Sequence, residues 1–254
     1  MPKTKIVYHE RYLTDYPTAS VERPARVQMI RQELSAHGYP FVTPQAAEEN
    51  DVLLVHYPNL VQAEKRDRDR FDVALLAAGG AIMTAEIAME GEPAFGLLRP
   101  PGHHASPGSN WGFCFFNNMA IAVQRLIFKK RIKRAFILDI DLHFGDGTDN
   151  YFAGRHDVVV DNVESSDRVE FLAQCQRGLE RAAPYDIIGI SAGFDRYIKD
   201  WGSTLMTENY RTIGEMVKNS SLKHCSGRRF ALLEGGYYLP DLGMNARNLI
   251  EGME

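Results

Sequence analysis

Short runs of β-branched and leucine residues alternate with longer segments of helical period along this chain, and this alternation constrains its fold most. Such alternation is typical of βα units that build a mostly parallel sheet. The expected strands span residues 5–9, 52–56, 94–99, 135–141, 157–163, 186–191 and 229–234. We therefore expect an α/β fold whose open, mostly parallel sheet is flanked by helices on both faces.

Helix start and stop signals lie between these strands. Pro24 opens a helix with one apolar face, and Gly38 is placed to end it. A long helix is expected over residues 71–90, and Ser166 and Thr207 are suited to cap two further helices. No linker rich in serine or glycine divides these elements, so we expect them to form one domain.

Composition and charge disfavour several classes of partner. A hydrophobic fraction of 44% and a charged fraction of 24% are ordinary for a globular protein, so disorder is not expected. Lysine and arginine number 29 against 33 acidic residues, which gives a net charge of −4 and no basic field for a nucleic-acid backbone. We therefore expect no direct nucleic-acid binding, and we interpret the basic run at 129–134 as a solvated helix end.

The spacing of the cysteines and the hydropathy of the chain indicate where in the cell the protein is located. The three cysteines are far apart and form no Cys-x-x-Cys pair, which is typical of reduced, buried thiols. The N-terminal residues hold no apolar stretch suited to a signal peptide, and the most apolar run, residues 73–83, is shorter than the ~20 residues that cross a bilayer. These features predict a cytoplasmic location without membrane contact.

Polar side chains gather directly after four of the expected strands. His103 and His104 follow one strand, residues 142–147 follow the next, and Asp195 and Tyr237 follow two more. The carboxyl ends of the strands in an open parallel sheet share one edge, where ligands bind. We therefore expect these four loops to line one pocket.

The middle loop carries the strongest chemical signal. Asp139, Asp141 and His143 alternate, so on an extended segment they point to the same side. Carboxylate and imidazole ligands suit Zn²⁺ or another first-row divalent ion, and Asp195 is the natural third ligand. A single aspartate here would more simply cap a helix or turn, but capping does not explain the joint set.

The remaining polar groups suit acid–base chemistry. His103 and His104 are candidates for a general base and an electrostatic or acid partner, each needing a carboxylate to fix its tautomer. Asp139 and Asp146 fit that role. Tyr237, after two glycines, is suited to hydrogen-bond a developing oxyanion.

These residues belong to motifs that resemble those of the histone deacetylase family, including its bacterial and archaeal relatives and the acetylpolyamine amidohydrolases. The motifs occur in the family's order: Glu22-Arg-Pro-Ala-Arg26, Val55-His56, Ala77-Ala-Gly-Gly80, Arg99-Pro-Pro-Gly-His-His-Ala105, Trp111-Gly-Phe-Cys-Phe-Phe-Asn117, Asp139-Ile-Asp-Leu-His-Phe-Gly-Asp-Gly-Thr148, Ser191-Ala-Gly-Phe-Asp195 and Leu233-Glu-Gly-Gly-Tyr237.

The resemblance implies an arginase-like α/β fold, with a single deacetylase-like catalytic domain over residues 1–254. It implies zinc-dependent hydrolysis of an acylated amine with release of acetate. Asp141, His143 and Asp195 would hold Zn²⁺, with Fe²⁺ as an alternative. A potassium ion could lie near Asp139.

By the same resemblance, each catalytic candidate takes a role. His104, backed by Asp146, would take a proton from the attacking water, and His103, paired with Asp139, would help to protonate the leaving amine. Tyr237 would hold the carbonyl oxygen.

The substrate tunnel carries the main departures from the family pattern. Gly112 and Phe113 would line the tunnel, and Arg26 would flank an acetate exit. The loop that bears a substrate-orienting acid is short, with Glu64 or Asp67 as candidates, and the long glycine-rich insertion that supplies a second aromatic wall is missing. We therefore expect a shallow tunnel that is open to varied acyl-amines or completed by a partner chain, such as a homo-oligomer.

Several alternatives stay open. The substrate could be acetyl-lysine in a protein, an acetylpolyamine or another small acyl-amine. A dimanganese ureohydrolase would need more carboxylates near Asp195 than the sequence supplies. A non-catalytic module that binds a metal or an acyl-amine would not need Tyr237, His103 and His104 together.

Overall fold

The computed structural model describes residues 3–254, and its strands form one parallel sheet in the order β2-β1-β3-β7-β6-β4-β5. The strands are β1 (Lys5–Val7), β2 (Phe41–Val42), β3 (Ala94–Gly96), β4 (Ala135–Asp139), β5 (Val158–Asn162), β6 (Ile187–Ala192) and β7 (Arg229–Leu233). All neighbouring strands pair in parallel. The expected open α/β sheet is confirmed.

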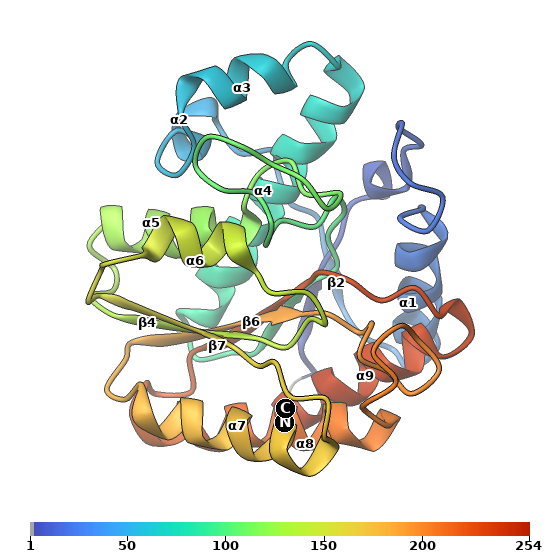
Figure 1. Ribbon diagram of the computed structural model, residues 1–254, viewed down its shortest axis with the longest axis vertical. Coiled ribbons are helices and arrows are strands. Elements are labelled where there is room, and N and C mark those ends of the chain that lie inside the picture. The colour runs from blue at the N-terminus through green and yellow to red at the C-terminus, as the bar shows by residue number, and fades with distance from the viewer. Residues whose placement is uncertain (1–2) are drawn as a thin grey trace.

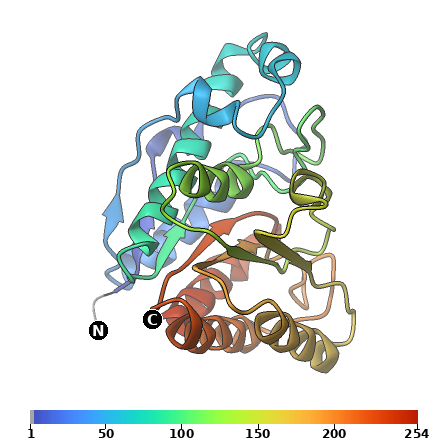
Figure 2. The ribbon, with the colours of Figure 1, turned by 90° about the vertical axis from the view of Figure 1, so that its left-hand side faces the viewer.

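Helices cover both faces of the sheet (Figures 1 and 2). One layer holds α1, α7, α8 and α9, and the other is built around α4 and α5 (Figure 1). Their bounds are η1 (Glu10–Leu13), α1 (Ala25–Ala36), α2 (Glu49–Val52), α3 (Pro58–Glu64), α4 (Arg68–Ala88), α5 (Asn118–Phe128), α6 (Asp146–Phe152), α7 (Arg168–Arg181), α8 (Thr207–His224) and α9 (Leu239–Met253).

The centre of the sheet is buried on both sides. Every residue of β4, β6 and β7 is buried, which explains why these strands are nearly continuous apolar runs rather than alternating ones. Helix α4 has the length and composition to cross a membrane, but 67% of its apolar window is buried inside the fold. The helix has 21 residues and is therefore longer than the apolar run at residues 73–83. It is a core helix that packs against β1, β3 and β7.

One expected strand is wrong and one real strand escaped prediction. Residues 52–56 begin at the end of α2 and continue as a turn, and their buried side chains Val52 and Val55 are three apart, which is a helical spacing. The edge strand β2 has only two residues, too few to show a period. Asp167 rather than Ser166 caps α7, because the Asp167 side chain accepts from the amide of Glu170.

A network of buried ion pairs connects the segment before α1 to the carboxyl edge of the sheet. Arg99 Nε donates to Glu22 Oε1 at 2.8 Å, and Arg26 Nη1 donates to the same oxygen at 3.3 Å. All three side chains are at most 1% exposed. Arg26 Nε also donates to the carbonyl of Gly236 at 2.6 Å, next to Tyr237. The network therefore fixes the loop that presents this tyrosine.

We expect Glu22→Gln to lower the free energy of unfolding by about 3–5 kcal/mol, because it leaves two buried guanidinium groups without a counter-charge. Urea unfolding measures this change. The control Glu92→Gln, which breaks an exposed pair with Lys5, should cost about 1 kcal/mol or less. Equal losses in the two variants would contradict the role given to Glu22.

Candidate active site

The loops after β3, β4, β6 and β7 meet at the carboxyl edge of the sheet. They enclose a cavity of about 110 Å³. Its lining comes from Pro101, His103, His104, Trp111, Gly112, Phe113, His143, Trp201, Gly235 and Tyr237. The structure thus brings together residues that the sequence separates by more than 130 positions.

Asp141, His143 and Asp195 form a group suited to hold a metal ion. One ligand atom from each lies within 4.8 Å of the others. His143 Nδ1 is 3.2 Å from Asp141 Oδ1 and 3.0 Å from Asp195 Oδ2. Both carboxylates are at most 3% exposed, so water cannot disperse their charge.

The chemistry of this donor set fits a divalent cation. Asp195 Oδ2 is buried, and among the described residues it accepts no hydrogen bond of good geometry, although His143 Nδ1 lies 3.0 Å away. Burial and the nearby Asp141 carboxylate raise the pKa of Asp195 to about 7. A cation in contact with both carboxylates would remove this repulsion and satisfy the orphaned oxygen.

A second buried group, His103, Cys114 and Glu234, also places its ligand atoms within 4.8 Å of one another. Burial raises the pKa of the Cys114 thiol well above its ordinary value, and it raises the pKa of Glu234 to about 7. Glu234 Oε2 already accepts from the amides of Gly102 and His103 at 2.8 and 3.2 Å. The Cys114 sulfur is therefore a protonated thiol, which is a poor metal ligand, and His103 Nδ1 already donates to Asp139. We assign this group to support of the histidine loop.

Two histidine–aspartate pairs lie beside the metal-ligand group. His103 Nδ1 donates to Asp139 Oδ2 at 3.0 Å, and His104 Nδ1 donates to Asp146 Oδ1 at 2.7 Å. Trp111 Nε1 donates to the other oxygen of Asp146 at 2.9 Å. Each carboxylate therefore fixes one imidazole tautomer, with Nε2 left for chemistry.

The electrostatics of the two imidazoles differ. Burial lowers the pKa of His103, but the carboxylates of Asp139 and Asp141 outweigh burial and hold this pKa well above its ordinary value. Burial and the charge on His103 lower the pKa of His104. A charged His103 can give a proton and a neutral His104 can accept one, as their expected roles require.

Tyr237 lines the cavity as expected, whereas Arg26 lies behind it. Burial raises the pKa of Tyr237, which keeps its hydroxyl protonated as a donor. The Arg26 guanidinium is 4.9 Å from the Tyr237 ring centre and donates to carbonyl groups of the same loop. It does not line the cavity, so its position supports Tyr237 rather than the walls.

Gly112 and Phe113 form one wall of the cavity, and both have a left-handed backbone conformation. Their φ values are +59° and +68°. A side chain at position 112 would clash with His104. A Cβ atom at Gly112 would lie 2.4 Å from His104 Cδ2, so only glycine lets this loop approach the histidine.

Trp201 supplies the second aromatic wall that the sequence analysis did not find. Its ring stacks on Tyr237 with 4.2 Å between ring centres, and its edge meets His143. The tryptophan is 52% exposed, so it stands at the mouth of the cavity. The expected substrate-orienting acids Glu64 and Asp67 do not line the cavity: Glu64 pairs with Arg70, and Asp67 caps α4.

The potassium site expected near Asp139 does not fit the structure. Its two carboxylate oxygens accept from His103 Nδ1 and the amide of Asp141, at 3.0 and 3.1 Å. Its carbonyl accepts from the amide of Val163 at 3.0 Å. The neighbouring carbonyl of Asp141 accepts from Arg196 Nε at 3.0 Å. These oxygens are therefore already engaged.

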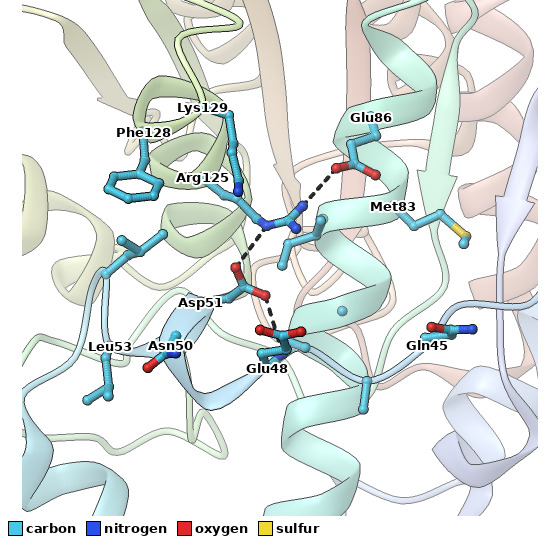
Figure 3. A pocket seen from close by; sticks show the side chains of 15 residues that line it. Gln45, Glu48, Asn50, Asp51, Leu53, Met83, Glu86, Arg125, Phe128 and Lys129 are labelled. Atoms are coloured by element: carbon cyan, nitrogen blue, oxygen red, sulfur yellow. Dashed lines mark hydrogen bonds and ion pairs between the residues drawn. The ribbon is translucent and has the colours of Figure 1, made fainter.

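A larger surface hollow of about 880 Å³ lies between α2, α4 and α5 (Figure 3). Arg125 bridges Asp51 and Glu86 across it, at 2.8 and 2.7 Å. Neither metal-ligand group of the described chain lies there. Size alone therefore does not mark the catalytic site.

The chain is similar in sequence to known proteins over most of its length. The histone deacetylase domain profile matches residues 20–168, more than half of the chain. A relative from Archaeoglobus fulgidus, named "Probable deacetylase", is 32% identical over 92% of this chain and 81% of its own length. The chain belongs to the histone deacetylase family.

Two further relatives carry different names, one a deacetylase and the other an acetylpolyamine amidohydrolase. A second protein named "Probable deacetylase", from Methanothermobacter thermautotrophicus, is 28% identical over 98% of this chain and 90% of its own length. The acetylpolyamine amidohydrolase of Mycoplana ramosa is 29% identical over 72% of this chain and 63% of its own length. Family membership identifies the chain as a deacetylase or amidohydrolase.

Solved structures establish the fold class. The HDA15 HD domain superposes with a TM-score of 0.88 at 24% identity, covering 99% of this chain and 89% of that one. An acetylpolyamine aminohydrolase from Burkholderia pseudomallei gives 0.87 at 22% identity, covering 98% of both chains. The arginase/deacetylase-like fold expected from the motifs is confirmed.

We expect Asp195→Asn to weaken Zn²⁺ binding at least roughly 100-fold, since the amide removes one of two carboxylate charges from the group. Competition with a chromophoric chelator measures the affinity. Asp149→Asn, at an exposed position on α6, is the matched control and should bind as the parent does. Unchanged affinity in Asp195→Asn would exclude this residue as a ligand.

Proposed function

We propose that this chain is a zinc-dependent deacetylase that hydrolyses the amide of an acetylated amine. One observation carries the proposal: His143, which forms a candidate metal-ligand group with Asp141 and Asp195, lines the same 110 Å³ cavity as His104 and Tyr237. A metal site, a base and a hydroxyl donor around one cavity are what metal-assisted amide hydrolysis requires.

Asp141, His143 and Asp195 would hold the ion, which when bound supplies a Lewis acid towards the scissile carbonyl. His104 accepts the proton of the attacking water through Nε2, while Asp146 stabilises the imidazolium. Tyr237 donates its hydroxyl to the carbonyl oxygen as negative charge develops there.

His103 gives a proton to the leaving amine. The Asp139 carboxylate keeps His103 charged until that step. Afterwards His104 releases the proton that it took from water, and His103 takes up one proton from solvent, which returns both groups to their starting states. His104 therefore acts as the general base and His103 as the general acid in hydrolysis of the same amide.

The dimensions of the cavity favour a small acyl group. Its volume of about 110 Å³ is well below the roughly 300–1,000 Å³ of pockets that enclose drug-sized ligands. Phe113 and Trp201 supply aromatic surface for an alkyl stem. We infer that acetyl is preferred to longer acyl groups, and that acetyl-lysine is the representative substrate.

An acetylpolyamine is the second candidate substrate. The exposed indole of Trp201 at the mouth favours it, because tryptophan faces attract cationic amines. We also propose a cytoplasmic location, with which the buried free thiols of Cys114, Cys175 and Cys225 agree.

We expect His104→Ala to lower turnover by about 10²- to 10⁴-fold and Tyr237→Phe by about 10²- to 10³-fold, with metal content unchanged, because each removes a group that acts on the reacting atoms. The assay is acetate release from acetyl-lysine peptides and acetylpolyamines, with and without a chelator.

Tyr238→Phe is the matched control, since Tyr238 packs beside Tyr197 and should keep the parent rate. Parent-like turnover in either active-site variant would refute the assigned role. Turnover that a chelator does not reduce would refute the metal dependence.

For Trp201→Ala we expect a rise in KM of roughly 2- to 10-fold with little change in metal content, since the variant loses one wall and its stacking on Tyr237. Initial-rate kinetics on the acetyl-lysine peptide measure it. Phe128→Ala, an exposed aromatic in the distant hollow, should leave KM unchanged. An unaltered KM for Trp201→Ala would remove this residue from the substrate site.

A further inference from the structure

Arg196 follows the candidate metal ligand Asp195 and is only 3% exposed. Its guanidinium donates to four backbone carbonyl oxygens that converge on it. Nε donates to Asp141 at 3.0 Å, and Nη2 donates to Leu142 at 3.4 Å. On the other side, Nη2 donates to Val163 at 2.6 Å and Nη1 to Ser165 at 3.1 Å.

These four carbonyls join two segments that no strand pairing holds together at this point. Asp141 and Leu142 belong to the loop after β4, which carries His143, whereas Val163 and Ser165 follow β5. Carbonyl oxygens that converge on one point are also the ligands that bind potassium in proteins. The guanidinium therefore occupies a place with the chemistry of a monovalent cation site.

The Arg196 guanidinium is buried and still carries a permanent positive charge. The Cζ atom of its planar guanidinium lies 4.8 Å from the centre of the Phe171 ring, and this ring excludes water from one face of the group. Arginine stays charged under such conditions because its ordinary pKa is so high.

We propose that the Arg196 guanidinium is a built-in cation that replaces the potassium ion expected beside Asp139. It is a positioning residue: it holds the carbonyls of the loop that presents Asp141 and His143. A second cation there would meet a buried like charge a few ångströms away and find the carbonyls already occupied. The protein should therefore be indifferent to potassium.

The inference rests on the proposed metal site, so its test uses a readout that needs neither metal nor turnover. The unfolding midpoint of the metal-free protein is measured in potassium chloride and in choline chloride at equal ionic strength. Zn²⁺ affinity is measured in the same two salts. For the parent we expect equal midpoints and affinities that agree within about twofold, since no potassium-linked stabilisation is present. A midpoint several degrees higher in potassium chloride would overturn the proposal.

Arg196→Ala removes the cation and leaves room for an ion among the carbonyls. We expect it to bind Zn²⁺ roughly 10- to 100-fold more weakly in choline chloride, as for loss of a group that orients metal ligands, and to regain affinity in potassium chloride. Parent-like affinity in choline chloride would overturn the proposal. Lost affinity that potassium does not restore would overturn it too, because the guanidinium would then support only the loop.

Arg229→Ala is the matched control. Arg229 is 4% exposed and also donates to backbone carbonyls, those of Met253 and Gly227, both at 2.7 Å. It lies at the first residue of β7, whereas the candidate site lies at the carboxyl ends of the strands. Its loss should lower the unfolding midpoint without any response to potassium. If Arg196→Ala fails to fold, the comparison of the two salts on the parent protein decides the question.

Discussion

The repulsion between two buried carboxylates is the constraint on which the site depends. Asp141 and Asp195 lie on different strand ends, each almost fully buried, with one imidazole nitrogen between them. Such a pair is unfavourable unless a cation offsets its charge. The fold concentrates negative charge at one buried point at the edge of the sheet, and a divalent ion held there would offset it.

The surrounding structure holds the loops of the site mainly through backbone groups. Arg26 and Arg196 donate to carbonyls of the loops that carry Tyr237 and His143, and the Glu234 carboxylate accepts from the amides of the loop that carries His103. Rigid support of this kind keeps catalytic groups in place without a cost of reorganisation during the reaction. Buried arginines serve the purpose well because one guanidinium can bind several carbonyls at once.

Sequence reasoning succeeded where polar residues follow strand ends, and it failed for contacts that no sequence period or motif relates. The apolar run before Asp139 predicted the strand, and the alternation of Asp139, Asp141 and His143 predicted its polar end, although β4 stops at Asp139. Trp201 escaped prediction because its partner, Tyr237, is 36 positions away and no period links them. Arg196 escaped because its acceptors are carbonyl groups, which every residue has and no sequence reveals.

Anomalous diffraction from crystals of the zinc-loaded protein tests the central claim most directly. The account predicts one strong zinc peak about 2.0–2.3 Å from a carboxylate oxygen of Asp141, a carboxylate oxygen of Asp195 and the imidazole of His143. A zinc peak between His103, Cys114 and Glu234 instead, or no ordered zinc within reach of Asp195, would contradict it.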